Sequence, residues 1–132
     1  MKYFVLTFCL LYGVYYYVSR HFEFHDTLVH AHTRKDAGWS GSVDYYVGLV
    51  YYQRGEYAKA QEALTQLKDD HPEDSNIPRG LVMLADAAEY TQDWEVARAA
   101  LSQYIEKYPN GRDIVLVKGR LDMLNYKHGP AH

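Results

Sequence analysis

The strongest constraint on the fold of this 132-residue chain is a pattern that occurs twice, 37 positions apart. The first copy, GLVYYQRGEYAKAQEALTQLKDDHP, starts at Gly48, and the second, ADAAEYTQDWEVARAALSQYIEKYP, starts at Ala85. Aligned without gaps, the copies have small residues at the same places, such as Ala60 and Ala97, and both end in proline. A repeat of this length predicts stacked structural units, each of which buries its apolar face against the next.

Each copy is expected to form a hairpin of two helices. In the first copy, apolar residues at helical spacing run up to Gly55, and glycine is the usual residue just past a helix end. From Tyr57 to His71 an amphipathic segment predicts a second helix, and Pro72 ends it because proline lacks an N–H group. Residues 113–125 continue the spacing and are expected to form the first helix of a third unit.

The order V-G-x-x-Y, then G-x-Y-x-x-A, then a closing proline resembles the tetratricopeptide repeat (TPR), here over residues 41–109. The residues of the first unit that match this family's pattern are Val47, Gly48, Tyr51, Gly55, Tyr57, Ala60 and Pro72. The second unit departs from it, because Gln92 stands where glycine is usual and Ala88 where tyrosine is usual. The spacing of 37 residues also exceeds the family's usual ~34. The resemblance implies a solenoid of helical hairpins that binds other proteins.

The N-terminal segment differs in kind, because residues 3–18, YFVLTFCLLYGVYYYV, carry no charge. This run approaches the ~20 residues of a bilayer-spanning helix, so residues 1–22 are expected to form a single transmembrane anchor, with tyrosines before Arg20 at the interface. A cleaved signal peptide is the alternative, but no A-x-A-like site follows the run. Bulky Phe8 argues against a lipoprotein site at Cys9. The few charges leave open which side of the membrane the rest of the chain faces.

Within the predicted anchor, aromatic residues spaced by four form a stripe on one side of a helix, beside a glycine that allows close approach. A tyrosine hydroxyl at membrane depth needs a hydrogen-bond partner, because lipid offers none. The stripe therefore predicts packing against another membrane protein, although ordinary tolerance of tyrosine near interfaces also explains it. Its residues are Phe4, Phe8, Tyr12, Gly13 and Tyr16.

The whole chain is expected to be all-α, with an N-terminal transmembrane helix followed by a short TPR-like helical-hairpin solenoid. Residues 23–40 would form a juxtamembrane segment and residues 41–126 the TPR-like domain. The domain would contain repeats over 41–74 and 78–111 and a capping helix over 112–126, leaving 127–132 as a loose tail. The capping helix would turn a polar face outward, formed by Arg112, Lys118, Arg120 and Asp122.

In TPR proteins, ligands usually lie in the concave groove lined by the first helix of each unit. Carried over by position, the resemblance implies a groove with an aromatic and apolar floor and charged groups on one side. Its residues would be Tyr45, Leu49, Tyr52 and Gln53 from the first unit, Arg79, Val82, Asp86, Glu89 and Tyr90 from the second, and Met123, with Tyr126, from the last helix. Such a floor suits a helix or an extended peptide better than a small polar substrate.

Metal or haem binding is the main competing interpretation. His21 and His25, four positions apart, would share one face of a helix and have the spacing of a ligand pair. No cysteine accompanies them, and a juxtamembrane role beside Glu23 and Asp26 also explains them. The sequence therefore predicts no metal site and no cofactor.

Composition and motifs argue against two further classes. A net charge of −3 and a pI near 6.1 give no dominant basic face, so nucleic acid is not expected as a partner. The chain contains no nucleophile elbow, no Gly-rich phosphate loop and no H-E-x-x-H motif, so it is not expected to be an enzyme.

The sequence thus predicts a bacterial, single-pass inner-membrane protein that acts as an adaptor or accessory subunit and stabilises a larger membrane complex. Other subunits would bind through the transmembrane helix and the groove, and a homo-oligomer is a further option. Two alternatives stay open: a redox- or pigment-associated membrane subunit that uses the juxtamembrane histidines, and an envelope-assembly factor.

Overall fold

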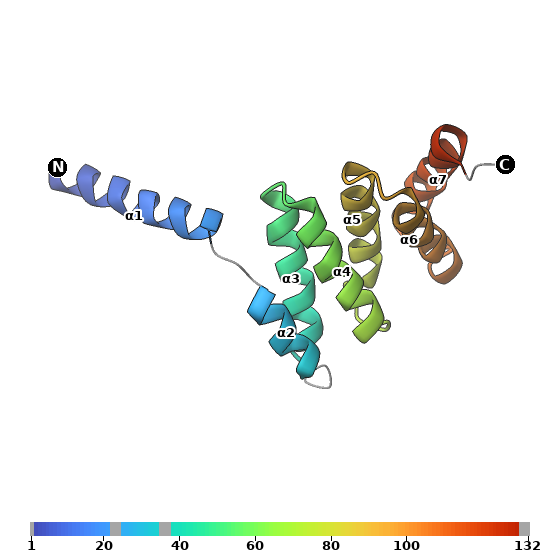
Figure 1. The fold of residues 1–132 in the computed structure, drawn as a ribbon, viewed down its shortest axis with the longest axis horizontal. Coiled ribbons are helices and arrows are strands. Elements are labelled where there is room, and N and C mark those ends of the chain that lie inside the picture. The colour runs from blue at the N-terminus through green and yellow to red at the C-terminus, as the bar shows by residue number, and fades with distance from the viewer. Residues whose placement is uncertain (1, 22–24, 35–37, 130–132) are drawn as a thin grey trace.

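The computed structural model describes residues 2–21, 25–34 and 38–129, and these residues form seven helices. The helices are α1 (Lys2–His21), α2 (His25–Thr33), α3 (Ser40–Gln53), α4 (Tyr57–Asp70), α5 (Ile77–Tyr90), α6 (Trp94–Lys107) and α7 (Ile114–His128). Figure 1 shows α2 to α7 stacked in chain order, with α1 standing apart from them. The all-α, TPR-like arrangement that the repeat predicts is therefore confirmed.

The two copies of the repeat form the hairpins α3–α4 and α5–α6, and α7 packs against α6. At Gly48 a β-carbon would lie 2.8 Å from Cγ of Leu64, so only glycine lets α3 and α4 approach this closely. The second hairpin has Ala85 and Ala97 at equivalent positions, and both are fully buried. Small residues thus set the distance between the helices of each hairpin.

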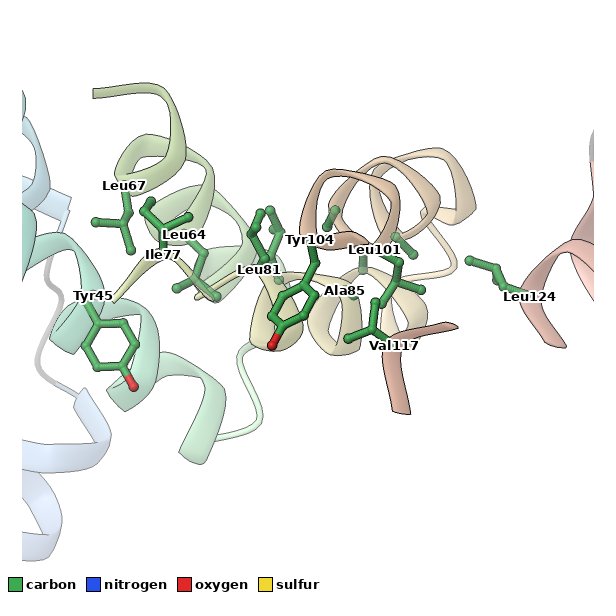
Figure 2. Packing of buried hydrophobic residues seen from close by; sticks show 14 residues of the cluster. Tyr45, Leu64, Leu67, Ile77, Leu81, Ala85, Leu101, Tyr104, Val117 and Leu124 are labelled. Atoms are coloured by element: carbon green, nitrogen blue, oxygen red, sulfur yellow. The ribbon is translucent and has the colours of Figure 1, made fainter. Parts of the chain in front are cut away.

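Apolar side chains between successive helices form two core clusters along the stack. One cluster joins α2, α3 and α4 around Leu28 and Tyr51 and reaches Ala87 on α5. The other runs from Tyr45 on α3 through Leu64 on α4 to Leu124 on α7, as Figure 2 shows. Full burial of one leucine side chain contributes about 1.5–3 kcal/mol, so these contacts hold each hairpin against the next.

Helix α2 lies inside residues 23–40, for which the sequence predicts a juxtamembrane segment outside the TPR-like domain. Its Leu28 is buried, and Gln66 on α4 donates hydrogen bonds both to the Leu28 carbonyl at 2.9 Å and to Oδ1 of Asp44 at 2.8 Å. His32 Nδ1 lies 2.6 Å from Oδ2 of Asp70. Helix α2 therefore covers the N-terminal end of the stack, where a preceding hairpin would otherwise pack.

The predicted transmembrane anchor is wrong. Among residues 2–21, 25–34 and 38–129, no helix is both long and apolar enough to span a membrane. Helix α1 has 20 residues, which is sufficient length, but five of them are tyrosines, and Lys2, Arg20 and His21 add charge or polarity at its ends. Absence of charge is not the same as apolarity, because each phenol hydroxyl is costly to remove from water.

Helix α7 also differs from the predicted capping helix. It continues through Lys127 and His128, which the sequence pattern assigns to a loose tail. Arg120, expected on a polar outer face, instead forms ion pairs with Asp86 and Glu89 on α5. The guanidinium thereby ties the last helix to the first helix of the preceding unit.

Candidate partner-binding groove

Two hollows lie along the first helices of the units, and together we call them the groove. The α3–α5 hollow has a volume of about 280 Å³ and the α7 hollow about 590 Å³. The α3–α5 hollow is lined by Tyr45, Tyr52, Arg79, Val82, Met83, Asp86 and Asp113. The α7 hollow is lined by Glu89, Trp94, Val115, Leu116, Gly119, Arg120, Met123, Leu124, Lys127 and His128.

The structure brings most of the predicted groove residues to these hollows. The predicted residues that line them are Tyr45, Tyr52, Arg79, Val82, Asp86, Glu89 and Met123. Leu49, Gln53, Tyr90 and Tyr126 line neither hollow. Tyr45 is only 7% exposed and belongs to the core cluster, so its ring supports the fold as well as forming part of the floor.

A polar bridge crosses the groove between the two hollows. The Tyr52 hydroxyl on α3 donates a hydrogen bond to Oδ2 of Asp86 on α5 at 3.2 Å. Arg120 on α7 contacts the other carboxylate oxygen of Asp86 and donates to Oε2 of Glu89 at 2.6 Å. Side chains from the first helices of all three units are thereby joined, and both carboxylates are partly neutralised.

The bridge changes the acidity of its members. Burial raises the pKa of the Tyr52 hydroxyl, and the negative charge of Asp86 raises it further. Burial lowers the pKa of Arg120, but the hydrogen bond to Glu89 and the charges of Asp86 and Glu89 outweigh that effect, so the pKa is raised overall. Arg120 therefore stays cationic and Tyr52 stays neutral at all physiological pH values.

Two aromatic stacks lie at the end of the groove where each first helix turns into the second. Tyr57 stacks on Tyr90 with ring centroids 4.1 Å apart, and Trp94 stacks on His128 at 3.8 Å. Tyr57 and Trp94 occupy equivalent places, 37 positions apart. Each stack joins neighbouring units, which gives the groove a rigid rim at this end.

Several lining residues are missed by the sequence analysis. Met83, Asp113, Trp94, Val115, Leu116, Gly119, Arg120, Leu124, Lys127 and His128 line the hollows without having been predicted. Leu116 and Gly119 stand 37 positions after Arg79 and Val82, so the repeat spacing contained a signal that would have found them. Asp113 and Trp94 lie at helix starts, where no signal in the sequence identifies a groove position.

A polar cluster below α2 resembles a catalytic arrangement in composition only. His71 Nε2 lies 2.8 Å from the Ser40 hydroxyl and 4.0 Å from Oδ2 of Asp44. In a serine hydrolase the carboxylate holds the opposite imidazole nitrogen from the one that faces the serine, whereas here both groups face Nε2. Ser40 and Asp44 are also fully buried, so no substrate reaches the hydroxyl.

The remaining predicted sites lie outside the groove. Among the described residues no cluster of three or more histidine, cysteine, aspartate or glutamate side chains has the geometry to hold a metal ion. The side chains of the candidate ligands His21 and His25 are outside the described residues. The stripe residues Phe4, Phe8, Tyr12 and Tyr16 are exposed on α1, and a β-carbon built on Gly13 would meet no atom within 4 Å outside the helix's own backbone. Their membrane packing was predicted from the span and is not retained.

Comparison with known proteins identifies a family for most of the helical repeat. The sequence profile of the family described as YfiO, outer membrane lipoprotein, matches residues 41–119, which include α3 to α6 and the start of α7. No curated protein sequence and no solved structure matches the chain. The matched region contains all residues that line the α3–α5 hollow and five of the ten that line the α7 hollow.

Proposed function

The chain belongs to the YfiO family of outer membrane lipoproteins, and on that premise we propose that it is an interaction module that holds a segment of a partner protein in the groove. The partner belongs to an assembly at the outer membrane of a bacterium. This corresponds to the envelope-assembly alternative of the sequence analysis, and it replaces the single-pass inner-membrane adaptor.

The α3–α5 hollow is the observation that carries this proposal. Tyr52, Val82 and Met83 give it an apolar floor on a rigid pair of helices. Arg79 and Asp113 stand at its edge, and within the described part of the chain neither side chain has an ion pair or hydrogen-bond partner. An apolar floor with unpaired charges of both signs suits a peptide segment that carries apolar and charged side chains.

A charge exchange at the edge of the hollow tests the proposal. We would introduce Arg79→Glu together with Asp113→Arg into the full-length chain, extract it gently from its native envelope, and identify the proteins that co-elute at a fixed ratio. The exchange keeps the net charge constant but reverses the pattern that a partner must match. We expect it to remove a partner that the wild-type chain retains.

Lys118→Glu with Asp122→Arg is the matched control, because both residues are exposed on α7 and line neither hollow. The control should retain the partner, and both variants should unfold at wild-type temperature. Equal retention by all three chains would show that the α3–α5 hollow does not hold the partner.

A further inference from the structure

The middle of α7 carries a glycine whose side-chain position is empty. A β-carbon built on Gly119 would meet no atom within 4 Å, and Gly119 lines the α7 hollow. The equivalent positions of the first two units are Tyr45 and Val82, whose side chains line the α3–α5 hollow. Glycine weakens the interior of a helix relative to alanine. Packing within the chain does not require it here, so the empty space itself is the feature to be explained.

Exposed apolar side chains surround this space. Leu116 lies one turn before Gly119 and Met123 one turn after it, and they are 54% and 58% exposed. Trp94 and the buried Leu124 complete the apolar lining. The result is a notch with an apolar rim and a backbone floor, of the kind that receives one large side chain from an opposing helix.

The charged residues that line the α7 hollow differ in whether they are paired. Arg120 is paired with Glu89 and also with Asp86, which lines the α3–α5 hollow, so the charge of Glu89 is partly offset. Lys127 has no ion pair with any described residue. Eight residues separate it from Gly119, which corresponds to roughly 12 Å along the helix. The hollow therefore offers an apolar notch and, about two turns away, one cation.

We propose that the α7 hollow binds an amphipathic helix of a partner protein, antiparallel to α7, with a large apolar side chain in the notch at Gly119 and a carboxylate beside Lys127. The antiparallel direction places the positive N-terminal end of the partner helix at the C-terminal end of α7, and acidic residues are favoured in the first turn of a helix. The carboxylate thus precedes the apolar residue by seven or eight positions. The inference rests on the proposed function and specifies a second contact for it.

Selection from a helical peptide library tests the inference while the partner itself is still unidentified. The full-length chain would select from displayed amphipathic peptides about four turns long, and affinities of the selected peptides would be measured by fluorescence anisotropy. We expect enrichment of peptides with a leucine, phenylalanine or tryptophan preceded at seven or eight positions by glutamate or aspartate. Gly119→Leu should weaken their binding about tenfold or more, because the added side chain fills the notch. Lys127→Glu should weaken binding severalfold and more strongly at low salt.

Gly119→Leu is an informative variant because its β-carbon meets no atom within 4 Å and leucine has a higher helix propensity than glycine, so the substitution should raise the helix stability. Loss of binding by a chain that unfolds at a higher temperature cannot be attributed to misfolding. Gly13→Leu on α1 is the matched control, since a β-carbon there also meets nothing within 4 Å. It should bind the selected peptides like the wild type.

Three results would overturn the inference: selected peptides that bind Gly119→Leu as well as the wild type, selected peptides that lack an acidic residue seven or eight positions before the large apolar one, or self-association of the wild-type chain that Gly119→Leu abolishes. The last would mean that a second copy occupies the hollow. Failure here leaves the proposed function standing if the exchange at Arg79 and Asp113 still removes the partner, because those residues do not line the α7 hollow.

Discussion

Gly55 and Gln92, 37 positions apart in the sequence, both hold a left-handed backbone, with φ angles of 79° and 61°. Each forms the turn between the two helices of its hairpin. Glycine adopts this conformation without steric cost, whereas a β-carbon at Gln92 crowds the following carbonyl oxygen. The second turn therefore has the geometry of the first without the residue that favours it.

Gln92→Gly should stabilise the protein. Removal of the β-carbon relieves the steric strain of the left-handed backbone in the folded state, but glycine also increases the conformational entropy of the unfolded chain. The net gain in the free energy of unfolding is expected to be about 0.5–1 kcal/mol. Urea denaturation measures it. The reverse change, Gly55→Gln, serves as the control and should destabilise by a similar amount. If Gln92→Gly does not raise the free energy of unfolding, the exposed Gln92 side chain must itself stabilise the fold by an amount that offsets the strain.

Gly48→Ala should destabilise the first hairpin, because the added β-carbon would lie 2.8 Å from two carbon atoms of Leu64. Overpacking of this kind costs about 1–3 kcal/mol. Gly119→Ala is the matched control, since it adds the same methyl group to open space and should stabilise the helix by up to ~1 kcal/mol. If thermal unfolding shifts equally for the two variants, close contact at Gly48 does not limit the hairpin.

Asp44→Asn tests the buried carboxylate beneath α2. Burial raises the pKa of Asp44 to about 6 from 3.8, and its Oδ2 atom has no hydrogen-bond partner among the described residues. The folded state therefore binds a proton more readily than the unfolded state. This contribution to stability is fully present below pH 3.8 and is lost as the pH rises through about 6.

Acidification from pH 8 to pH 5 should accordingly stabilise the wild type by about 1 kcal/mol more than Asp44→Asn. The comparison between the two proteins removes the effect of titrating groups that do not interact with Asp44. At pH 8 the asparagine variant should be the more stable protein. Identical pH profiles in chemical denaturation would show that Asp44 keeps an ordinary pKa.

Tyr104→Phe should loosen the start of α7. The Tyr104 hydroxyl on α6 accepts a hydrogen bond from the backbone N–H of Asp113 at 3.0 Å, and the ring is fully buried. Its loss should cost about 1 kcal/mol in unfolding free energy. Hydrogen exchange should accelerate at the first turn of α7 and remain unchanged in α3. Unaltered exchange at Asp113 would mean that this hydrogen bond does not anchor α7.

The hairpins could be predicted because the repeat encodes them locally. The small residues Gly48 and Ala85 indicate where the two helices of a hairpin approach closely. The proline at the end of each unit indicates where its second helix ends. Register within the repeat then places Tyr52, Val82 and Asp86 on the same side, and the α3–α5 hollow brings them together. The position of these residues on one side of the stack could therefore be predicted from the repeat spacing in the sequence.

Features that depend on contacts between distant segments could not be predicted. Helix α2 buries few apolar side chains, and Leu28 is fixed by the side chain of Gln66, 38 positions away. From the sequence, Arg120 is expected to face solvent, because its ion-pair partners Asp86 and Glu89 lie more than 30 positions away in the chain. The transmembrane prediction was wrong for a different reason. It relied on the absence of charge in residues 3–18 and gave too little importance to the polarity of the five tyrosines of α1.

Site-specific photocrosslinking tests whether the α3–α5 hollow contacts the partner protein. A photoreactive amino acid would replace Arg79, at the edge of the α3–α5 hollow, in cells that naturally contain the protein. Lys118, exposed but outside both hollows, would be the control position. We expect one discrete adduct with a protein of the outer membrane from position 79 and none from position 118. Equal adducts at both positions, or none at position 79, would contradict the assignment of the groove as the partner-binding surface.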